Sequence, residues 1–141
     1  MAFLLDTSAV SELTKRHPNE AYTAWLSRQQ ARDTYVATLT IGEIEAGIGL
    51  LPSSQKRRRL ESWLTDLIAE FETRILSFDV ACARMWGRAV SAARRGGRTL
   101  PVVDSQLGAI AHVYGLAVVT RNPKHFNDGV FPSLEVLSPW V

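Results

Sequence analysis

The fold class is decided by residues 3–13, FLLDTSAVSEL. Three apolar residues suited to a buried strand, Phe3 to Leu5, run directly into Asp6, and an amphipathic segment follows at once. A strand that passes straight into a helix is typical of α/β proteins. A carboxylate at this junction indicates a functional site only if other acids in the chain occupy equivalent positions.

Short aliphatic runs alternate with helical patterns along the rest of the chain. The predicted strands cover residues 3–5, 35–37, 74–76, 117–119 and 135–137. Beyond the segment after Asp6, the predicted helices begin near residues 19, 40, 53, 79 and 105 and end near residues 28, 51, 71, 95 and 114. This alternation predicts an α/β fold in which helices cover both faces of a mostly parallel sheet.

Apolar spacing also predicts which helix faces are buried. In the long helix that ends at residue 71, the apolar positions recur every three or four residues and predict one core face. That face comprises Leu60, Trp63, Leu64, Leu67, Ile68 and Phe71. Asp79 is the predicted N-cap of the following helix, which the pair Gly96-Gly97 ends.

Length and composition indicate one soluble globular domain, residues 1–141, with 46% hydrophobic and 21% charged residues. The single cysteine, Cys82, cannot form an internal disulfide and is expected to be buried in a reducing, cytoplasmic setting. No apolar run approaches the roughly 18 residues of a membrane span, and no secretory signal is expected. The net charge of +2 does not identify a partner.

Three acids lie at or near predicted helix starts: Asp6, Glu43 and Asp104. Parallel strands joined by right-handed crossovers end at the same edge of a sheet, and ligands of open α/β sheets bind along that edge. We therefore expect the three acids to meet in one crevice. The alternative is local: Asp6 and Asp104 as N-caps, and Thr40-x-x-Glu43 as a capping box.

Clustered carboxylates repel one another unless a cation neutralises them, so a meeting of these acids predicts a metal site. Mg²⁺ or Mn²⁺ is the expected ion, since hard divalent cations prefer carboxylate and water oxygens. A zinc site is not expected, because the chain has neither a CxxC nor an HExxH motif.

Five segments taken in order resemble the PIN-domain ribonucleases of the VapC type, in particular the FitB-like branch. They are DTSAVSEL (6–13), TIGEIEAGI (40–48), GRTLPVVDSQLGAIA (97–111), VVTRNPKHF (118–126) and LSPW (137–140). The resemblance spans nearly the whole chain. It implies a three-layer α/β/α sandwich and a metal-dependent endoribonuclease that is the toxin of a type II toxin–antitoxin system. It also implies an RNA substrate, a cognate antitoxin and a homodimer as partners.

By position, the resemblance implies that Asp6, Glu43 and Asp104 are metal ligands and catalytic residues. The family's fourth site position falls on Asn122, whose amide oxygen is a weaker ligand than a carboxylate. His125 stands where relatives often carry Asp, and Asp128 is a possible substitute. Ser8, Ser105 and Thr120 neighbour these positions and are expected to hydrogen-bond either the carboxylates or their local backbone.

Two groups of basic residues are candidates for contacting RNA phosphates, residues 56–59 and the set Arg94, Arg95 and Arg98; solvated surface charge and helix C-capping are the alternatives.

Two other functions remain open. One is a binding module that holds nucleic acid or a partner with little or no cleavage. The other is a phosphotransferase, which Ser8 disfavours because that chemistry requires a second Asp two positions after Asp6.

Overall fold

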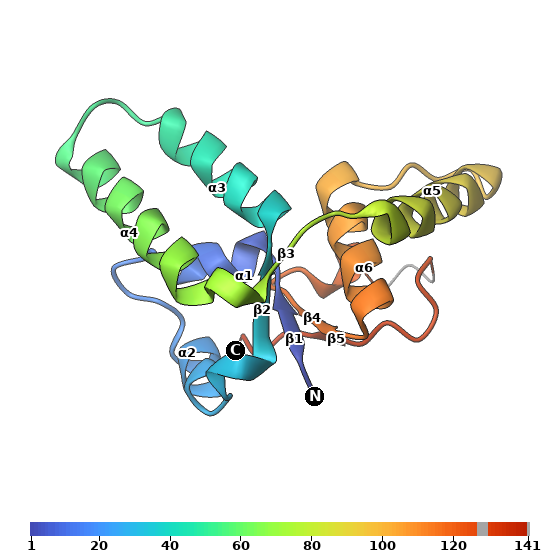
Figure 1. Ribbon diagram of the computed structural model, residues 1–141, viewed down its shortest axis with the longest axis horizontal. Coiled ribbons are helices and arrows are strands. Elements are labelled where there is room, and N and C mark those ends of the chain that lie inside the picture. Colours follow the sequence, from blue (N-terminus) through green and yellow to red (C-terminus); the bar gives the residue numbers. More distant parts are fainter. Residues whose placement is uncertain (127–129, 141) are drawn as a thin grey trace.

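The computed structural model describes residues 1–126 and 130–140, and its centre is a parallel sheet in the order β3-β2-β1-β4-β5 (Figure 1). The strands are β1 (Phe3–Leu5), β2 (Thr34–Ala37), β3 (Ile75–Leu76), β4 (Ala117–Val119) and β5 (Val136–Leu137). Each neighbouring pair is parallel. All five predicted strands are therefore confirmed to within one residue at either end.

The helices alternate with these strands as predicted. They are α1 (Thr7–Glu12), α2 (Glu20–Ser27), α3 (Thr38–Gly49), α4 (Gln55–Phe71), α5 (Val80–Arg95) and α6 (Val102–Tyr114). Short 3₁₀ turns occupy Ala31–Asp33, Glu72–Arg74 and Pro123–His125. No helix in the described ranges has the length and apolar character that would let it span a bilayer.

Two hydrophobic cores lie on opposite faces of the sheet. Phe3 and Leu5 of β1 belong to the core that includes buried residues of α1 to α4. Leu4, which points the other way, belongs to the core that includes buried residues of α5 and α6. Figure 1 shows α1–α4 and the pair α5–α6 on either side of the sheet. The predicted three-layer α/β/α architecture is confirmed, and it explains why β1 is apolar at every position.

Local sequence fixes the helix starts. Ser54 accepts a hydrogen bond from Arg57 N at the start of α4, and Asp79 accepts one from Cys82 N at the start of α5. The Asp79 N-cap was predicted. Tyr114, the last residue of α6, also donates its hydroxyl hydrogen bond to Asp79, which ties the end of α6 to the start of α5.

Three expectations about the helices are wrong. Ile68 is 40% exposed, because it lies about 100° around α4 from buried Leu67 and therefore outside the narrower buried stripe. α3 begins at Thr38 with Ala37 as N-cap, so Thr40 cannot begin a capping box. α6 begins at Val102 after Pro101, so Asp104 is the third helical residue and not an N-cap.

Candidate active site

Asp6 lies at the carboxyl end of β1 and is only 4% exposed. Its backbone N–H donates to Val119 O of β4 at 3.0 Å, which fixes the chain at the sheet edge. Its Oδ1 accepts hydrogen bonds from Ala9 N at 2.9 Å and from Ser8 Oγ at 2.6 Å. Asp6 is therefore the N-cap of α1, as the local interpretation predicted, and it is also a deeply buried carboxylate.

The surroundings of Asp6 disfavour its charge. Burial raises the pKa of Asp6 most strongly, and hydrogen bonds from Ser8, Thr120 and Ala9 lower it only in part. The negative charge of Asp104 raises the pKa further. Asp104 is thus close enough for the two carboxylates to repel, as expected of acids gathered at one edge of the sheet. A bound cation would relieve this repulsion.

Asp104 projects from the first turn of α6, and its Oδ2 lies 2.9 Å from Nδ1 of His125. His125 belongs to the 3₁₀ turn that follows β4. This contact joins two segments that approach the sheet edge from different elements. The sequence alone had singled out His125 only as an unusual residue at a family position.

Glu43 lies in the second turn of α3, and its Oε1 accepts a hydrogen bond from Thr7 Oγ1 at 2.5 Å. Thr7 Oγ1 also lies 3.2 Å from Oγ1 of buried Thr40. The Glu43 side chain therefore points toward α1 and the residue next to Asp6. The local alternative for Glu43, a capping box, is wrong, because that motif would turn Glu43 back toward the N-terminus of its own helix.

The acids are linked in pairs: Asp6 with Asp104 through charge, and Glu43 with the neighbour of Asp6 through a hydrogen bond. Across residues 1–126 and 130–140, no three His, Cys, Asp or Glu side chains stand as a ready-made metal centre. A metal site shared by Asp6, Glu43 and Asp104 thus stays a prediction.

The predicted supporting residues divide into two kinds. Ser8 donates to Asp6 and accepts from Arg121 N at 3.0 Å, and Thr120 also hydrogen-bonds Asp6. Ser105 instead donates to Val102 O at 2.8 Å and accepts from Trp86 Nε1 at 2.8 Å. Its expected bond to a carboxylate is therefore replaced by its local role and by a link to α5.

Two candidates remain, Asn122 and Asp128. Asn122 is exposed, and its backbone N–H donates to Thr120 Oγ1 at 3.0 Å, so it supports the turn that holds Thr120. Its predicted site role stays a prediction. Asp128 lies outside the described residues.

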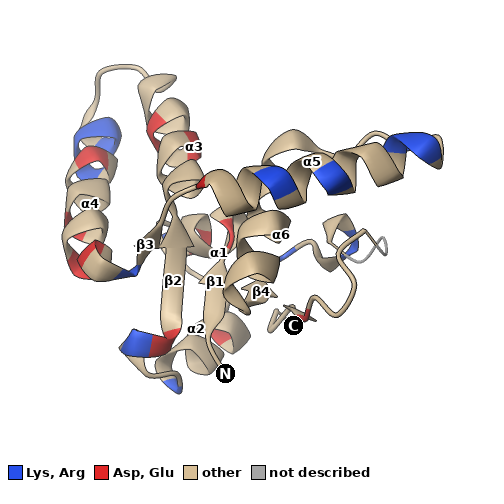
Figure 2. Ribbon diagram, turned by 45° about the vertical axis from the view of Figure 1, so that its right-hand side comes forward, with Lys and Arg blue, Asp and Glu red and all other residues tan. Residues whose placement is uncertain are grey.

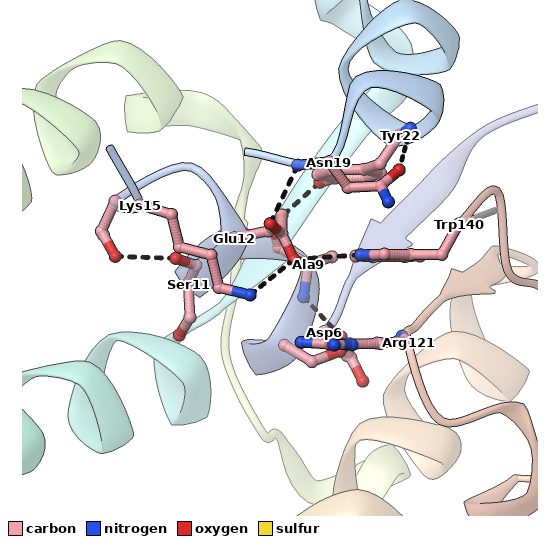
Figure 3. A network of polar contacts seen from close by, with 11 residues as sticks. Asp6, Ala9, Ser11, Glu12, Lys15, Asn19, Tyr22, Arg121 and Trp140 are labelled. Carbon is pink, nitrogen blue, oxygen red and sulfur yellow. Dashed lines mark hydrogen bonds and ion pairs between the residues drawn. The ribbon is translucent and has the colours of Figure 1, made fainter. Parts of the chain in front are cut away.

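Glu12 is a second buried acid (Figure 3). It was not predicted from the sequence. Glu12 is 3% exposed and accepts hydrogen bonds from Trp140 Nε1 at 3.0 Å, Lys15 Nζ at 3.1 Å and Asn19 N at 3.1 Å. The bond from Trp140 contributes most to holding the pKa of Glu12 below its ordinary value. One signal was available: Glu12 follows Ala9 by three residues and so shares the buried face of α1.

Tyr22 connects this second acid to the Asp6 region. Its hydroxyl donates to Ala9 O at 2.9 Å, and its ring stacks on Trp140 with centroids 4.3 Å apart. Burial raises the pKa of Tyr22 most, and the charges of Asp6 and Glu12 raise it further. The Glu12 network therefore packs beneath the candidate site and holds α1 against α2 and the C-terminal segment (Figure 3).

A parallel α/β/α sandwich with a buried acid, Asp6, next to further acids at the carboxyl edge of its sheet defines the class to which this protein belongs. The family model described as "PIN domain" matches residues 3–129, and the chain belongs to that family. The resemblance to VapC-type toxins of the FitB-like branch, inferred from five segments, is confirmed.

Three characterised relatives are similar over nearly their whole length. Plasmid stability protein StbB of Pseudomonas syringae is 33% identical over 97% of both chains. Toxin FitB of Neisseria gonorrhoeae is 32% identical over 97% of both chains. VapC ribonuclease Y4jK of Sinorhizobium fredii is 27% identical over 97% of this chain and 96% of its own.

Solved structures agree with these relatives. The crystal structure of FitAcB from Neisseria gonorrhoeae superposes with a TM-score of 0.88 and 31% identity, covering 98% of both chains. A structure of FitAB bound to an IR36 DNA fragment superposes with a TM-score of 0.88 and 29% identity, covering 99% of this chain and 96% of that one. The predicted PIN-like fold is confirmed.

Proposed function

We propose that this protein is a metal-dependent endoribonuclease and the toxin of a type II toxin–antitoxin system. The observation that carries the proposal is the buried Asp6 carboxylate held beside Asp104 at the sheet edge. The names of two relatives, a VapC ribonuclease and a toxin, support the activity and the biological role.

The residues at this edge fit a hard divalent cation such as Mg²⁺ or Mn²⁺. Asp6 is a carboxylate whose burial and acidic neighbour disfavour its charge, and the side chains linked to it are hydroxyls. Oxygen donors of this kind suit Mg²⁺ and Mn²⁺, and the chain's single cysteine, Cys82, is buried in a hydrophobic core. Asp6 and Asp104 would hold the ion, with Glu43 completing the site directly or through water.

The side chains around the acids would hold the carboxylates in place for the reaction. Ser8 and Thr120 orient Asp6, Thr7 orients Glu43, and His125 holds Asp104 through its Oδ2. When bound, the cation would neutralise the scissile phosphate and lower the pKa of a coordinated water. The chain's own contribution would be a set of hydrogen-bonded acidic side chains at the edge of the sheet where the RNA backbone would bind.

The partner proposed for this toxin is a cognate antitoxin. The similar structures include complexes named FitAB and VapBC, which motivates the same arrangement here. A homodimer is proposed from the family resemblance alone. An antitoxin that covers the acidic edge would prevent cleavage, and a basic side chain would suit the paired carboxylates as a replacement for metal.

The test is cleavage of total RNA by the purified, antitoxin-free protein in Mg²⁺ or Mn²⁺, with EDTA as the metal-free arm. Asp6→Asn and Asp104→Asn should abolish discrete cleavage while the far-UV circular dichroism spectrum is retained. Asp66→Asn, an exposed acid-to-amide change on α4, is the matched control and should cleave normally. Intact RNA after prolonged incubation with either metal would overturn the nuclease proposal and favour a binding module.

A further inference from the structure

α5 carries a one-sided positive charge. Its sixteen residues contain Arg84, Arg88, Arg94 and Arg95 but no Asp or Glu. α4, by comparison, pairs Arg57 with Glu61 at 3.2 Å and also carries Asp66 and Glu70. Figure 2 shows the basic positions along α5 where this helix extends away from the sheet.

Helix geometry places these arginines opposite the packing face. Cys82, Ala89 and Ala93 are buried on one side of α5, and Cys82 and Ala89 belong to cores that also contain residues of α6. At 100° per residue, Arg84, Arg88 and Arg95 fall within about 40° of one another and roughly 180° from Ala93. Trp86 Nε1 donates to Ser105 of α6, which fixes the rotation of α5 about its own axis. The arginines therefore face solvent along one line, at intervals of about 6 and 10.5 Å along the axis.

The three guanidinium groups have no competing partner in the part of the chain that the structure describes. Within residues 1–126 and 130–140, none of Arg84, Arg88 and Arg95 takes part in a side-chain hydrogen bond, ion pair or ring contact. Together with Gly87 and Ser91 they line an open hollow of about 720 Å³, here called the α5 basic face. Its charge is available to a ligand at no cost in broken contacts.

Gly87 is a second indication that the α5 basic face binds a ligand. A glycine in a helix interior costs about 0.5–1 kcal/mol relative to alanine. At Gly87 a Cβ atom would meet nothing within 4 Å, so packing within the chain does not require the missing side chain. Because Gly87 has no side chain, the helix backbone between the arginines is accessible, and a ligand's backbone can approach it closely.

We propose that the α5 basic face binds the sugar–phosphate backbone of single-stranded RNA outside the acidic edge. This inference rests on the proposed ribonuclease function and names how the substrate is held. α5 packs on α6, and the first turn of α6 carries Asp104. An RNA chain bound at the acids would therefore need only to cross α5 to reach the arginines. A row of guanidinium groups suits a row of phosphates, and the release of counterions favours their contact.

A second copy of this chain is a poorer occupant. Two α5 basic faces brought together around a two-fold axis would place arginines against arginines with no acid on either helix. Like charges that face each other across an interface are strongly unfavourable. The basic face therefore suits a polyanion.

The test is fluorescence anisotropy with a 5′-labelled single-stranded RNA of about 12 nucleotides, within the range of known single-strand sites. Binding is measured in EDTA so that the RNA stays intact. Arg84→Gln/Arg88→Gln should weaken binding roughly tenfold, and the slope of log K against log salt should become shallower by about 1.4, or 0.7 for each lost phosphate contact.

Arg28→Gln/Arg32→Gln is the matched control. These two arginines have the same four-residue spacing, are exposed, and flank the start of β2 at the opposite end of the strands. The control should bind within twofold of the wild type. Gly87→Leu changes no charge and should also weaken binding, because its side chain fills the floor of the face.

Equal losses in both double variants, or no change in the α5 variant, would overturn the inference. So would a shift of the α5 variant to a smaller oligomer in size-exclusion chromatography, because the face would then belong to a subunit interface. Cleavage assays in Mg²⁺ separate the two proposals. If Arg84→Gln/Arg88→Gln leaves cleavage unaffected, only the proposed role of the α5 basic face is contradicted. If RNA binding depends on the arginines but no cleavage occurs, only the proposed nuclease activity is contradicted.

Discussion

Thr7 Oγ1 donates a hydrogen bond to Glu43 Oε1 and so joins α1 to α3 across 36 positions of the sequence. Thr7 directly follows Asp6, so this bond fixes the third acid relative to the first. The sequence led us to expect Glu43 near Asp6, but it did not predict the contact with Thr7.

Thr7→Val should therefore disturb both stability and the site. The change leaves Glu43 without its donor and buried Thr40 without a neighbouring hydroxyl, which should cost about 1–2 kcal/mol. Urea denaturation measures this loss, and metal-dependent RNA cleavage should fall in parallel. Thr7→Ser keeps the hydroxyl and should restore cleavage. Thr23→Val, which removes only an exposed bond to Glu20 O within α2, should leave cleavage unchanged.

Asp6→Asn should raise the melting temperature at pH 7 in EDTA. The pKa of Asp6 is raised in the folded state from an ordinary value of 3.8, so its contribution to stability is full below pH 3.8 and is lost as pH rises through the folded pKa. Asn caps a helix as well as Asp does and cannot ionise. The advantage of the variant should shrink as the pH is lowered toward 3.8. A variant that melts below the wild type at pH 7 would contradict this account of Asp6.

Trp140→Phe should destabilise the protein most at neutral pH. Phenylalanine keeps the stacking on Tyr22 but loses the Nε1 donor to Glu12, and a hydrogen bond to a charged group contributes about 1.5–3 kcal/mol. The pKa of Glu12 is lowered from its ordinary 4.5, so the stability it contributes is present above pH 4.5 and is lost as pH falls through the folded pKa.

The difference between wild type and Trp140→Phe should therefore be constant above pH 4.5 and shrink below it. Thermal melts at a series of pH values measure this difference. In Glu12→Gln the pH-dependent part should vanish. A difference that is independent of pH would show that Trp140 contributes through packing alone.

Two mid-helix glycines should respond oppositely to alanine. A Cβ at Gly108 of α6 would lie 2.7 Å from Cε2 of buried Phe131, so Gly108→Ala forces the ring to move and should cost about 1–3 kcal/mol. Gly87→Ala meets nothing within 4 Å and should instead stabilise the protein by about 0.5–1 kcal/mol. Urea denaturation of both variants measures the contrast. Equal effects in the two would contradict the packing described around Phe131.

The strands could be predicted almost to the residue because each is a short run of mainly apolar residues, fully buried in β1 and β4 and half-buried in β3 and β5. Helix starts were less accurate where no side chain caps the helix: Ala37 and Pro101 precede α3 and α6 without a cap hydrogen bond. In contrast, the starts set by Asn19, Ser54 and Asp79 could be located, because each of these residues caps its helix with a side-chain oxygen.

The sequence indicated which acids could approach the sheet edge, but not the hydrogen bonds that hold them there. The carboxyl edge of a parallel sheet follows from topology, which is why Asp6 and Glu43, whose helices each follow a strand, could be expected near one another. The bonds from Thr7 to Glu43, His125 to Asp104 and Trp140 to Glu12 join distant segments. Such pairs depend on the packing of several elements, and no local pattern in the sequence encodes them.

The central claim is that Asp6, Glu43 and Asp104 together hold a divalent cation. Isothermal titration of Mn²⁺ into the antitoxin-free protein tests it most directly, with Asp66→Asn as control. We predict saturable binding to the wild type and the control, loss of that binding in Asp6→Asn and Asp104→Asn, and weaker binding in Glu43→Gln. Mn²⁺ binding that is undiminished in Asp104→Asn would contradict the claim.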